Sequence, residues 1–126
     1  MAESYKDLKI YGDSYQLAVE IHKMTMKLPK YELYEMGSQI RRASKSICLN
    51  IVEGYGRRRY KNEFIQFLTY SLASCDEVKE SLKFLYDTGS LEDKNGYEAM
   101  SRRCDEIGRM LYAFIRSVEA GHKSKR

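Results

Sequence analysis

The sequence predicts an all-α protein, an antiparallel up-down-up-down four-helix bundle that forms one domain of 126 residues. Apolar residues recur at steps of three and four along four separate stretches, which is the period of an α-helix. The chain contains one proline, and most of its eight glycines lie outside those stretches. No sustained alternation of apolar and polar residues is present, so no strand is expected.

The first two helices are predicted at about residues 13–28 and 33–54. The first ends before Pro29, because a helix rarely continues into the residue that precedes a proline. The second ends near Gly54 and Gly56, since glycine readily adopts the left-handed conformation that closes a helix. The two apolar stripes are Leu17, Ile21, Met24 and Leu28, followed by Met36, Ile40, Ala43, Ile47 and Ile51.

The third and fourth helices are predicted at about residues 61–87 and 91–119, followed by a basic C-terminal tail over residues 121–126. Asn62 is the candidate cap of the third helix and Ser90 that of the fourth. The third stripe is Phe64, Leu68, Ser71, Cys75, Val78, Leu82 and Leu85. The fourth is Tyr97, Met100, Cys104, Ile107, Leu111, Phe114 and Val118.

Further apolar residues lie off these stripes, and most of them belong to the third predicted helix. They are Ile65, Phe67, Leu72, Phe84 and Tyr86, with Tyr112 and Ile115 on the fourth helix. Either the third helix is the most buried of the four, or its second apolar face contacts another subunit. Because an exposed stripe of this length would form a large apolar patch, we expect a homo-oligomer.

The composition excludes several classes of protein. No apolar run approaches the roughly 20 residues that a membrane-spanning helix needs, so no membrane association is expected. The N-terminal residues contain acids and lysines but no apolar core of a signal peptide. Cys48, Cys75 and Cys104 lie far apart without the spacing of a disulfide framework or a metal site. We therefore expect reduced, buried thiols in a cytoplasmic protein.

No group of residues indicates catalysis. His22 and His122 are the only histidines, and neither has a cysteine or carboxylate at metal-binding spacing. The Gly-Tyr-Gly at residues 54–56 follows a predicted helix and lacks the lysine of a phosphate-binding loop. The sequence thus predicts a protein that is not an enzyme, with no catalytic residues, no metal and no cofactor.

The most unusual feature is a basic segment from Ser38 to Lys61. It has a net charge of +6, although the whole chain is only +4. Arginine binds phosphate oxygens in pairs, and tyrosine rings stack on unpaired bases. The candidate nucleic-acid-binding residues are Arg41, Arg42, Lys45, Tyr55, Arg57, Arg58, Arg59, Tyr60 and Lys61.

Two other interpretations of this segment remain: the arginines pair with acids of a neighbouring subunit, or they serve only solubility. The position of Arg57 to Lys61 favours an external partner. These residues lead directly into the third predicted helix, where cations oppose the helix dipole. We therefore expect the charges to serve something other than the fold, and RNA or DNA is the favoured partner.

Polar residues also lie beside the stripe of the second predicted helix: Ser46, Asn50, Glu53 and Gly54. One interpretation is an acid used in catalysis or ion binding. The favoured one is a structural polar lock that fixes the corner between the second and third helices or a subunit contact. A half-buried Glu53 would then need a basic partner, either Arg42 or an arginine of the next loop.

Several short motifs together resemble one known family. They are Leu28-Pro29-Lys30-x-Glu32, Gln39-Ile40-Arg41-Arg42-Ala43, Ser46-Ile47, Asn50-Ile51-x-Glu53-Gly54, Gly56-Arg57, Phe64-Ile65-x-Phe67-Leu68 and Thr88-Gly89-Ser90-Leu91. The set resembles the four-helix-bundle proteins encoded in the intervening sequences of bacterial 23S rRNA genes, also called the S23 family. The resemblance covers roughly residues 8–118.

This resemblance implies a bacterial cytosolic bundle that assembles into a ring, typically a pentamer. A related branch comprises the accessory variability proteins of diversity-generating retroelements, which are basic pentamers that bind nucleic acid and a reverse transcriptase. The leading hypothesis is a non-catalytic oligomer that binds structured RNA through the basic segment. The alternative is a protein-interaction scaffold or an accessory subunit of a reverse transcriptase.

Overall fold

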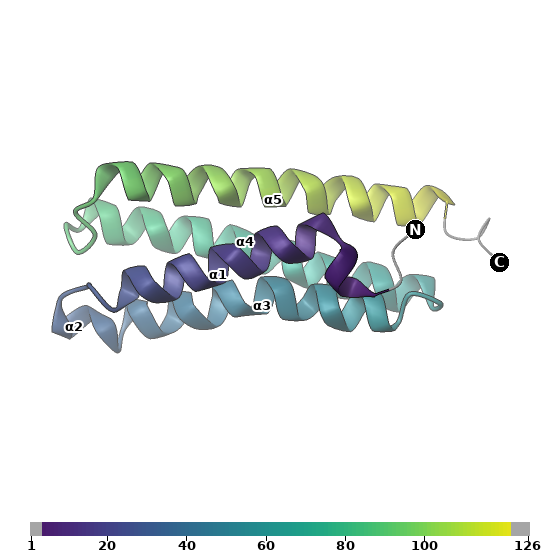
Figure 1. Cartoon of the computed structure of the whole chain (residues 1–126), viewed down its shortest axis with the longest axis horizontal. Helices are drawn as coiled ribbons and strands as arrows, with labels where there is room; N and C mark the ends of the chain where they lie inside the picture. Colours follow the sequence, from purple (N-terminus) through teal and green to yellow (C-terminus); the bar gives the residue numbers. More distant parts are fainter. Residues whose placement is uncertain (1–3, 122–126) are drawn as a thin grey trace.

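A computed structural model describes residues 4–121 of the chain. Four long helices pack side by side, each antiparallel to the one before it, and the described residues include no strand (Figure 1). The predicted fold class is therefore confirmed. The long helices are α1 (Lys9–Thr25), α3 (Met36–Gly56), α4 (Lys61–Asp87) and α5 (Lys94–Gly121). A 3-10 helix, η1 (Tyr5–Asp7), precedes α1, and a four-residue helix, α2 (Lys30–Leu33), separates α1 from α3.

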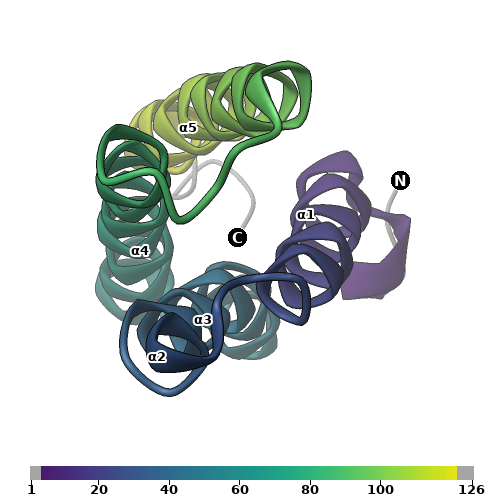
Figure 2. The same ribbon diagram turned by 90° about the vertical axis from the view of Figure 1, so that its left-hand side faces the viewer.

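The four long helices surround one apolar core, and consecutive helices are neighbours around it (Figure 2). The predicted stripes face this core, because every third or fourth residue of a helix lies on the same side. The side chains with almost no exposed surface come from all four helices: Leu17, Ile21, Ile40, Ile47, Ile51, Leu68, Leu82, Leu85, Ile107 and Leu111. The three cysteines are buried as free thiols.

Helices α3 and α4 pack closely at the end of the bundle where the chain passes from one to the other. A Cβ atom added to Gly54 would lie 3.1 Å from the Cβ of Phe67 and 3.4 Å from the carbonyl oxygen of Phe64. Further along the seam, the buried hydroxyl of Ser71 donates a 2.7 Å hydrogen bond to the carbonyl of Ile47. A small residue and a cross-helix hydrogen bond thus set the spacing of this pair.

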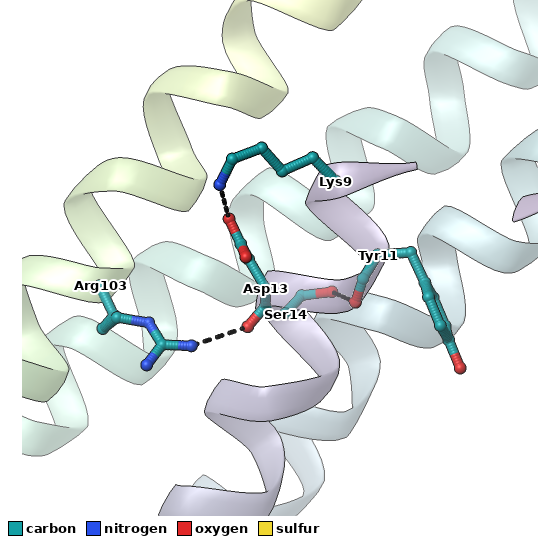
Figure 3. A network of polar contacts seen from close by, with 5 residues as sticks. All are labelled: Lys9, Tyr11, Asp13, Ser14 and Arg103. Carbon is teal, nitrogen blue, oxygen red and sulfur yellow. Dashed lines mark hydrogen bonds and ion pairs between the residues drawn. The ribbon is translucent and has the colours of Figure 1, made fainter. Parts of the chain in front are cut away.

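Helices α1 and α5 are joined by one arginine (Figure 3). The guanidinium of Arg103 donates to the backbone carbonyl of Asp13 at 3.4 Å and to the carboxylate of Glu20 at 3.2 Å. The carboxylate of Asp13 is itself paired with the ammonium group of Lys9 at 2.7 Å. Arg103 therefore contacts α1 at two places about two turns apart.

The boundaries at the first corner differ from the prediction. Helix α1 begins at Lys9 instead of residue 13 and ends at Thr25 instead of residue 28. Pro29 is the N-cap of α2, with the extended backbone (φ −54°, ψ 149°) that a proline ring favours there. Because α2 takes up residues 30–33, α3 begins only at Met36, whose N–H donates to the Glu32 carboxylate at 3.2 Å.

The predicted caps are also wrong. The hydroxyl of Ser90 is buried and donates to the carboxylate of Glu32 at 3.0 Å, so it links the last corner to α2. Helix α5 starts at Lys94 and not at residue 91, and Asp93 caps it by accepting the N–H of Gly96 at 3.0 Å. Asn62 lies inside α4, whose N-cap is Tyr60 and lacks a side-chain cap.

The second apolar face of α4 is only partly covered within the chain. Tyr86 stacks on Tyr97 of α5, with ring centroids 4.4 Å apart. Leu72 packs against the core, whereas Phe84 and Tyr112 are exposed. Within residues 4–121, no helix is both long and apolar enough to cross a bilayer.

Candidate nucleic-acid interface

The basic segment occupies two separate places in the structure. Arg41, Arg42 and Lys45 lie in the first half of α3, whereas Arg57 to Lys61 form the corner between α3 and α4. The helix rises 1.5 Å per residue, so the 16 positions from Arg41 to Arg57 correspond to about 24 Å. We call residues 57–61 the basic corner. It lies at the same end of the bundle as the last turn of α5 (Figure 1).

Arg41 is bonded within the chain. Its half-buried guanidinium donates to the hydroxyl of Thr25 at 2.9 Å and to the carbonyl of Leu33 at 3.2 Å. It therefore ties α3 to the end of α1 and to α2. Arg42 and Lys45 are exposed, and Arg42 donates to the hydroxyl of Ser38 at 2.7 Å.

Arg57 is held by acids of its own chain. Its guanidinium lies 2.5 Å from the carboxylate of Glu53 and 3.3 Å from that of Glu63, and it covers the ring of Phe67 at 4.8 Å. Glu63 lies just beyond the basic segment defined from the sequence. Extending that window by two residues would have revealed it. The basic corner and these two acids together carry four positive and two negative charges, a net charge of +2.

Arg58 and Tyr55 form a stacked pair. The Arg58 guanidinium lies 4.2 Å from the centroid of the Tyr55 ring and donates to the Tyr55 carbonyl at 2.9 Å. Tyr55 is only 8% exposed, and its ring also meets Phe64 edge-on at 6.5 Å. Tyr55, a candidate nucleic-acid-binding residue, is therefore buried and has Arg58 over its ring. Tyr55 is the one aromatic residue of α3 and belongs to the core.

Arg59, Tyr60 and Lys61 form the second half of the basic corner. Arg59 is exposed and lies 5.9 Å from the centroid of the Tyr60 ring, whose residue is 56% exposed. Lys61 is the first residue of α4 and is half-buried. In the described part of the chain, no carboxylate oxygen lies within 4 Å of the charged nitrogens of Arg59 or Lys61.

The arginines of the basic corner lie between two helix ends. They precede α4, where cations oppose the helix dipole, as the sequence predicts. Arg57 and Arg58 also follow the end of α3, and they donate to the carbonyls of Glu53 at 3.3 Å and Tyr55 at 2.9 Å. Cations at a helix C-terminus are favourable. These two arginines therefore contribute to the fold as well.

The four residues of the predicted polar lock do different things. The Asn50 amide donates to the carbonyl of Ser46 at 2.9 Å, within α3 itself. Glu53 is exposed, not half-buried, and its partner is the loop residue Arg57. Gly54 is the one that contacts α4 directly. Gly54 and the Glu53–Arg57 ion pair lie at the predicted corner.

The described residues give no geometric sign of a metal centre. No three of their His, Cys, Asp and Glu side chains are grouped so that they could hold one metal ion. His22 is exposed on α1. His122 and the basic tail after Gly121 lie outside the described residues. The basic corner is thus the structural feature on which a functional proposal rests.

The sequence of this chain matches one known protein family. Residues 6–113 match the 23S rRNA-intervening sequence proteins, which is most of the chain. The chain belongs to the 23S rRNA-intervening sequence protein family. The resemblance seen in the motifs is therefore confirmed.

One solved structure similar to this intervening-sequence protein comes from Bacteroides thetaiotaomicron. It is a protein of unknown function from the S23 ribosomal protein family, 26% identical, with a TM-score of 0.76. The similarity covers 85% of this chain and 95% of the Bacteroides chain. None of the curated proteins matches this one. The comparisons therefore show the family and the fold of this chain.

Proposed function

We propose that this intervening-sequence protein is a non-catalytic, cytoplasmic, oligomeric protein that binds RNA through its basic corner. The observation that carries the proposal is the exposure of Arg59 and Tyr60, next to the half-buried Lys61, at one end of the bundle. Two cations without a described carboxylate partner lie beside an exposed aromatic ring. That combination suits a polyanion with unpaired bases.

The contacts of the basic corner indicate that its residues have different roles. Arg57 is held by Glu53, Glu63 and Phe67, so it orders the loop instead of facing a ligand. Arg59 and Lys61 supply charge to phosphate oxygens, which gives most of the affinity and makes it depend on salt. Tyr60 stacks on an unpaired base, a contact that tolerates any sequence. Structured RNA with a single-stranded loop offers both kinds of group.

Fluorescence anisotropy with a labelled RNA hairpin tests this proposal. The double variant Arg59→Ala/Lys61→Ala should bind more weakly. Its log–log salt dependence should be shallower by about 0.7–0.9 for each phosphate contact that is lost. The charge-matched control is Lys94→Ala/Arg102→Ala, which removes two exposed cations of α5. The absence of RNA or DNA binding at low salt would refute the proposal, as would equal losses in the two double variants.

Tyr60→Ala tests the aromatic contact separately. Loss of one stacked base should weaken binding by about 1–3 kcal/mol. Tyr34→Ala is the matched control, because Tyr34 is also an exposed tyrosine but lies beside α2 at the opposite end of the bundle. If both tyrosine variants bind as the wild type does, phosphate contacts alone explain binding.

Exposed apolar residues support the oligomeric part of the proposal. Tyr15 and Leu49 are each more than half exposed, as are Phe84 and Tyr112 on the second apolar face of the α4–α5 pair. Contact with further copies would cover such side chains. Light scattering after size exclusion should give a mass several times 14.8 kDa, and five times that mass for the pentamer that the family resemblance implies. A monomer would contradict this part.

A second candidate is a protein-interaction scaffold or an accessory subunit of a reverse transcriptase. It is favoured by two exposed aromatic residues, Tyr31 in α2 and Tyr34 at the C-terminus of that helix, since tyrosine is enriched at protein interfaces. A reverse transcriptase from a neighbouring gene should then be retained by the immobilised protein. Retention lost in Tyr31→Ala/Tyr34→Ala but kept in Arg59→Ala/Lys61→Ala would favour the scaffold.

A further inference from the structure

Two cysteines face each other across the seam between α4 and α5. The thiol of Cys75 on α4 donates a 3.2 Å hydrogen bond to the backbone carbonyl of Cys104 on α5. Both residues are about 2% exposed. Cys48, the third cysteine, lies on α3 and donates to the carbonyl of Lys45 in its own helix. One pair of nucleophilic side chains is therefore brought together, and the proposed RNA binding makes no use of it.

The cysteine pair lies at a hollow in the α4–α5 seam. The hollow has a volume of about 510 Å³, and its lining includes both cysteines. Leu72, Gly108 and Tyr112 form its apolar part. A Cβ atom added to Gly108 would meet only the side chain of Leu72, at 3.9 Å, so the missing side chain leaves space there. A small solute can enter this hollow, although the cysteines have little exposed surface of their own.

The charged residues that line the hollow include both acids and bases. Lys79 and Asp105 form an ion pair of 2.5 Å across the seam, and Asp76 and Arg109 complete the lining. Contact with the Cys104 side chain lowers the pKa of Cys75. Contact with the Cys75 side chain, together with burial, raises the pKa of Cys104. The two thiols are thus unequal, and Cys75 is the better nucleophile because reactivity follows the thiolate.

We propose that Cys75 and Cys104 form a dithiol modification site, which a small peroxide oxidises reversibly to an intramolecular disulfide between α4 and α5. The Cys75 thiolate attacks one peroxide oxygen and breaks the O–O bond, which leaves a sulfenic acid and a hydroxide ion. The hydroxide takes the proton of the Cys104 thiol. The Cys104 sulfur then attacks the Cys75 sulfur, the S–S bond forms, and hydroxide leaves.

The balance of this reaction is complete. The two sulfurs lose two electrons and the two peroxide oxygens gain them. The hydroxide that leaves Cys75 takes up the proton that the Cys75 thiol released when its thiolate formed, so with hydrogen peroxide the products are one disulfide and two water molecules. A dithiol reductant reverses the reaction by thiol–disulfide exchange. The crosslink joins residues that are 29 positions apart and restricts the unfolded chain. Oxidation should therefore raise the unfolding temperature by several degrees.

The test treats the folded full-length protein with hydrogen peroxide. After alkylation in denaturant, intact mass spectrometry counts the remaining thiols, and peptide mapping identifies any linked pair. We expect the oxidised protein to lose two of its three alkylatable thiols, to contain a Cys75–Cys104 peptide within one chain, and to recover all three after a dithiol reductant. The wild-type map needs no variant, so a substitution that fails to fold does not weaken the test.

Variants supply the controls. Cys48→Ala should form the same crosslink, whereas Cys104→Ala should form none. Gly108→Leu keeps both thiols but fills the hollow, and it should slow oxidation several-fold. The proposal is overturned if all three thiols stay alkylatable at peroxide doses that crosslink the urea-unfolded chain. It is also overturned if the disulfide joins two chains or includes Cys48, or if oxygen is added without a crosslink.

Discussion

Gly54 allows a quantitative prediction about the corner that carries the proposed RNA site. It lies in the last turn of α3, where an added Cβ would be 3.1 Å from the Cβ of Phe67 and 3.4 Å from the carbonyl oxygen of Phe64. Both neighbours are close to the backbone of α4, so neither can move aside as a flexible side-chain tip could. Gly54→Ala should therefore push the two helices apart.

The magnitude follows from two opposing effects. Alanine in place of a helical glycine is favourable by about 1 kcal/mol. Overpacking of a tight contact costs about 1–3 kcal/mol. Gly12→Ala is the matched control, because Gly12 is also helical and an added Cβ there has no neighbour within 4 Å. The helix-propensity effect is common to both variants, so the control should be more stable than Gly54→Ala by about 1–3 kcal/mol.

Urea unfolding followed by circular dichroism at equal protein concentrations measures this difference. With an m-value of about 1–3 kcal/mol/M, the two unfolding midpoints should differ by about 1 M. The concentration must be matched, since assembly would stabilise the folded state. If Gly54→Ala is stabilised as much as Gly12→Ala, the close approach of α3 and α4 does not depend on this glycine and the reasoning fails.

Three further changes have expected outcomes. Asp93→Ala removes the cap on the Gly96 N–H and should lower the free energy of unfolding by about 1 kcal/mol in a urea titration. An unchanged free energy of unfolding would mean that solvent caps α5 equally well. Ser71→Ala deletes the buried hydrogen bond to the Ile47 carbonyl and should lower the free energy of unfolding by about 0.5–1.5 kcal/mol, measured in the same way. A gain in stability would contradict this role of the hydrogen bond. Burial raises the pKa of the Cys48 thiol above its ordinary value, so the stabilisation from the neutral thiol is fully present below the unfolded-state pKa and is lost as the pH rises from there through the folded-state pKa. Thermal melts should show a smaller decrease in unfolding temperature above about pH 9 for Cys48→Ala than for the wild type, and equal decreases would exclude this effect.

Much of the helical architecture could be predicted from the sequence, because helix formation is largely local. The spacing of Leu68, Cys75, Leu82 and Leu85 fixes one apolar side of α4 whatever the rest of the chain does. The bounds of α4, Lys61–Asp87, agree with the predicted 61–87. The first corner was harder to predict. Pro29 marked the break, but the short α2 depends on contacts such as that between Ser90 and Glu32, which are 58 positions apart.

The basic segment shows the limit of sequence reasoning most clearly. The net charge of the segment follows from the sequence alone, but the helix separates Arg41 from Arg57 by about 24 Å, and the two residues have different partners. Arg41 bonds to Thr25 and Leu33, and Arg57 bonds to Glu53 and Glu63. Such pairings need distant residues to be brought within about 4 Å, which charge counting along the chain cannot show.

The sequence by itself determined the family, the four amphipathic helices and the positive corner, since periodicity, motifs and charge are local properties. Only the tertiary structure decided which side chains face outward. It buried Tyr55 in the core, left Tyr60 exposed, and placed Cys75 against Cys104. The physical reason is that burial and partnership are set by the packing of one helix against another, and the chain order alone does not specify those distances.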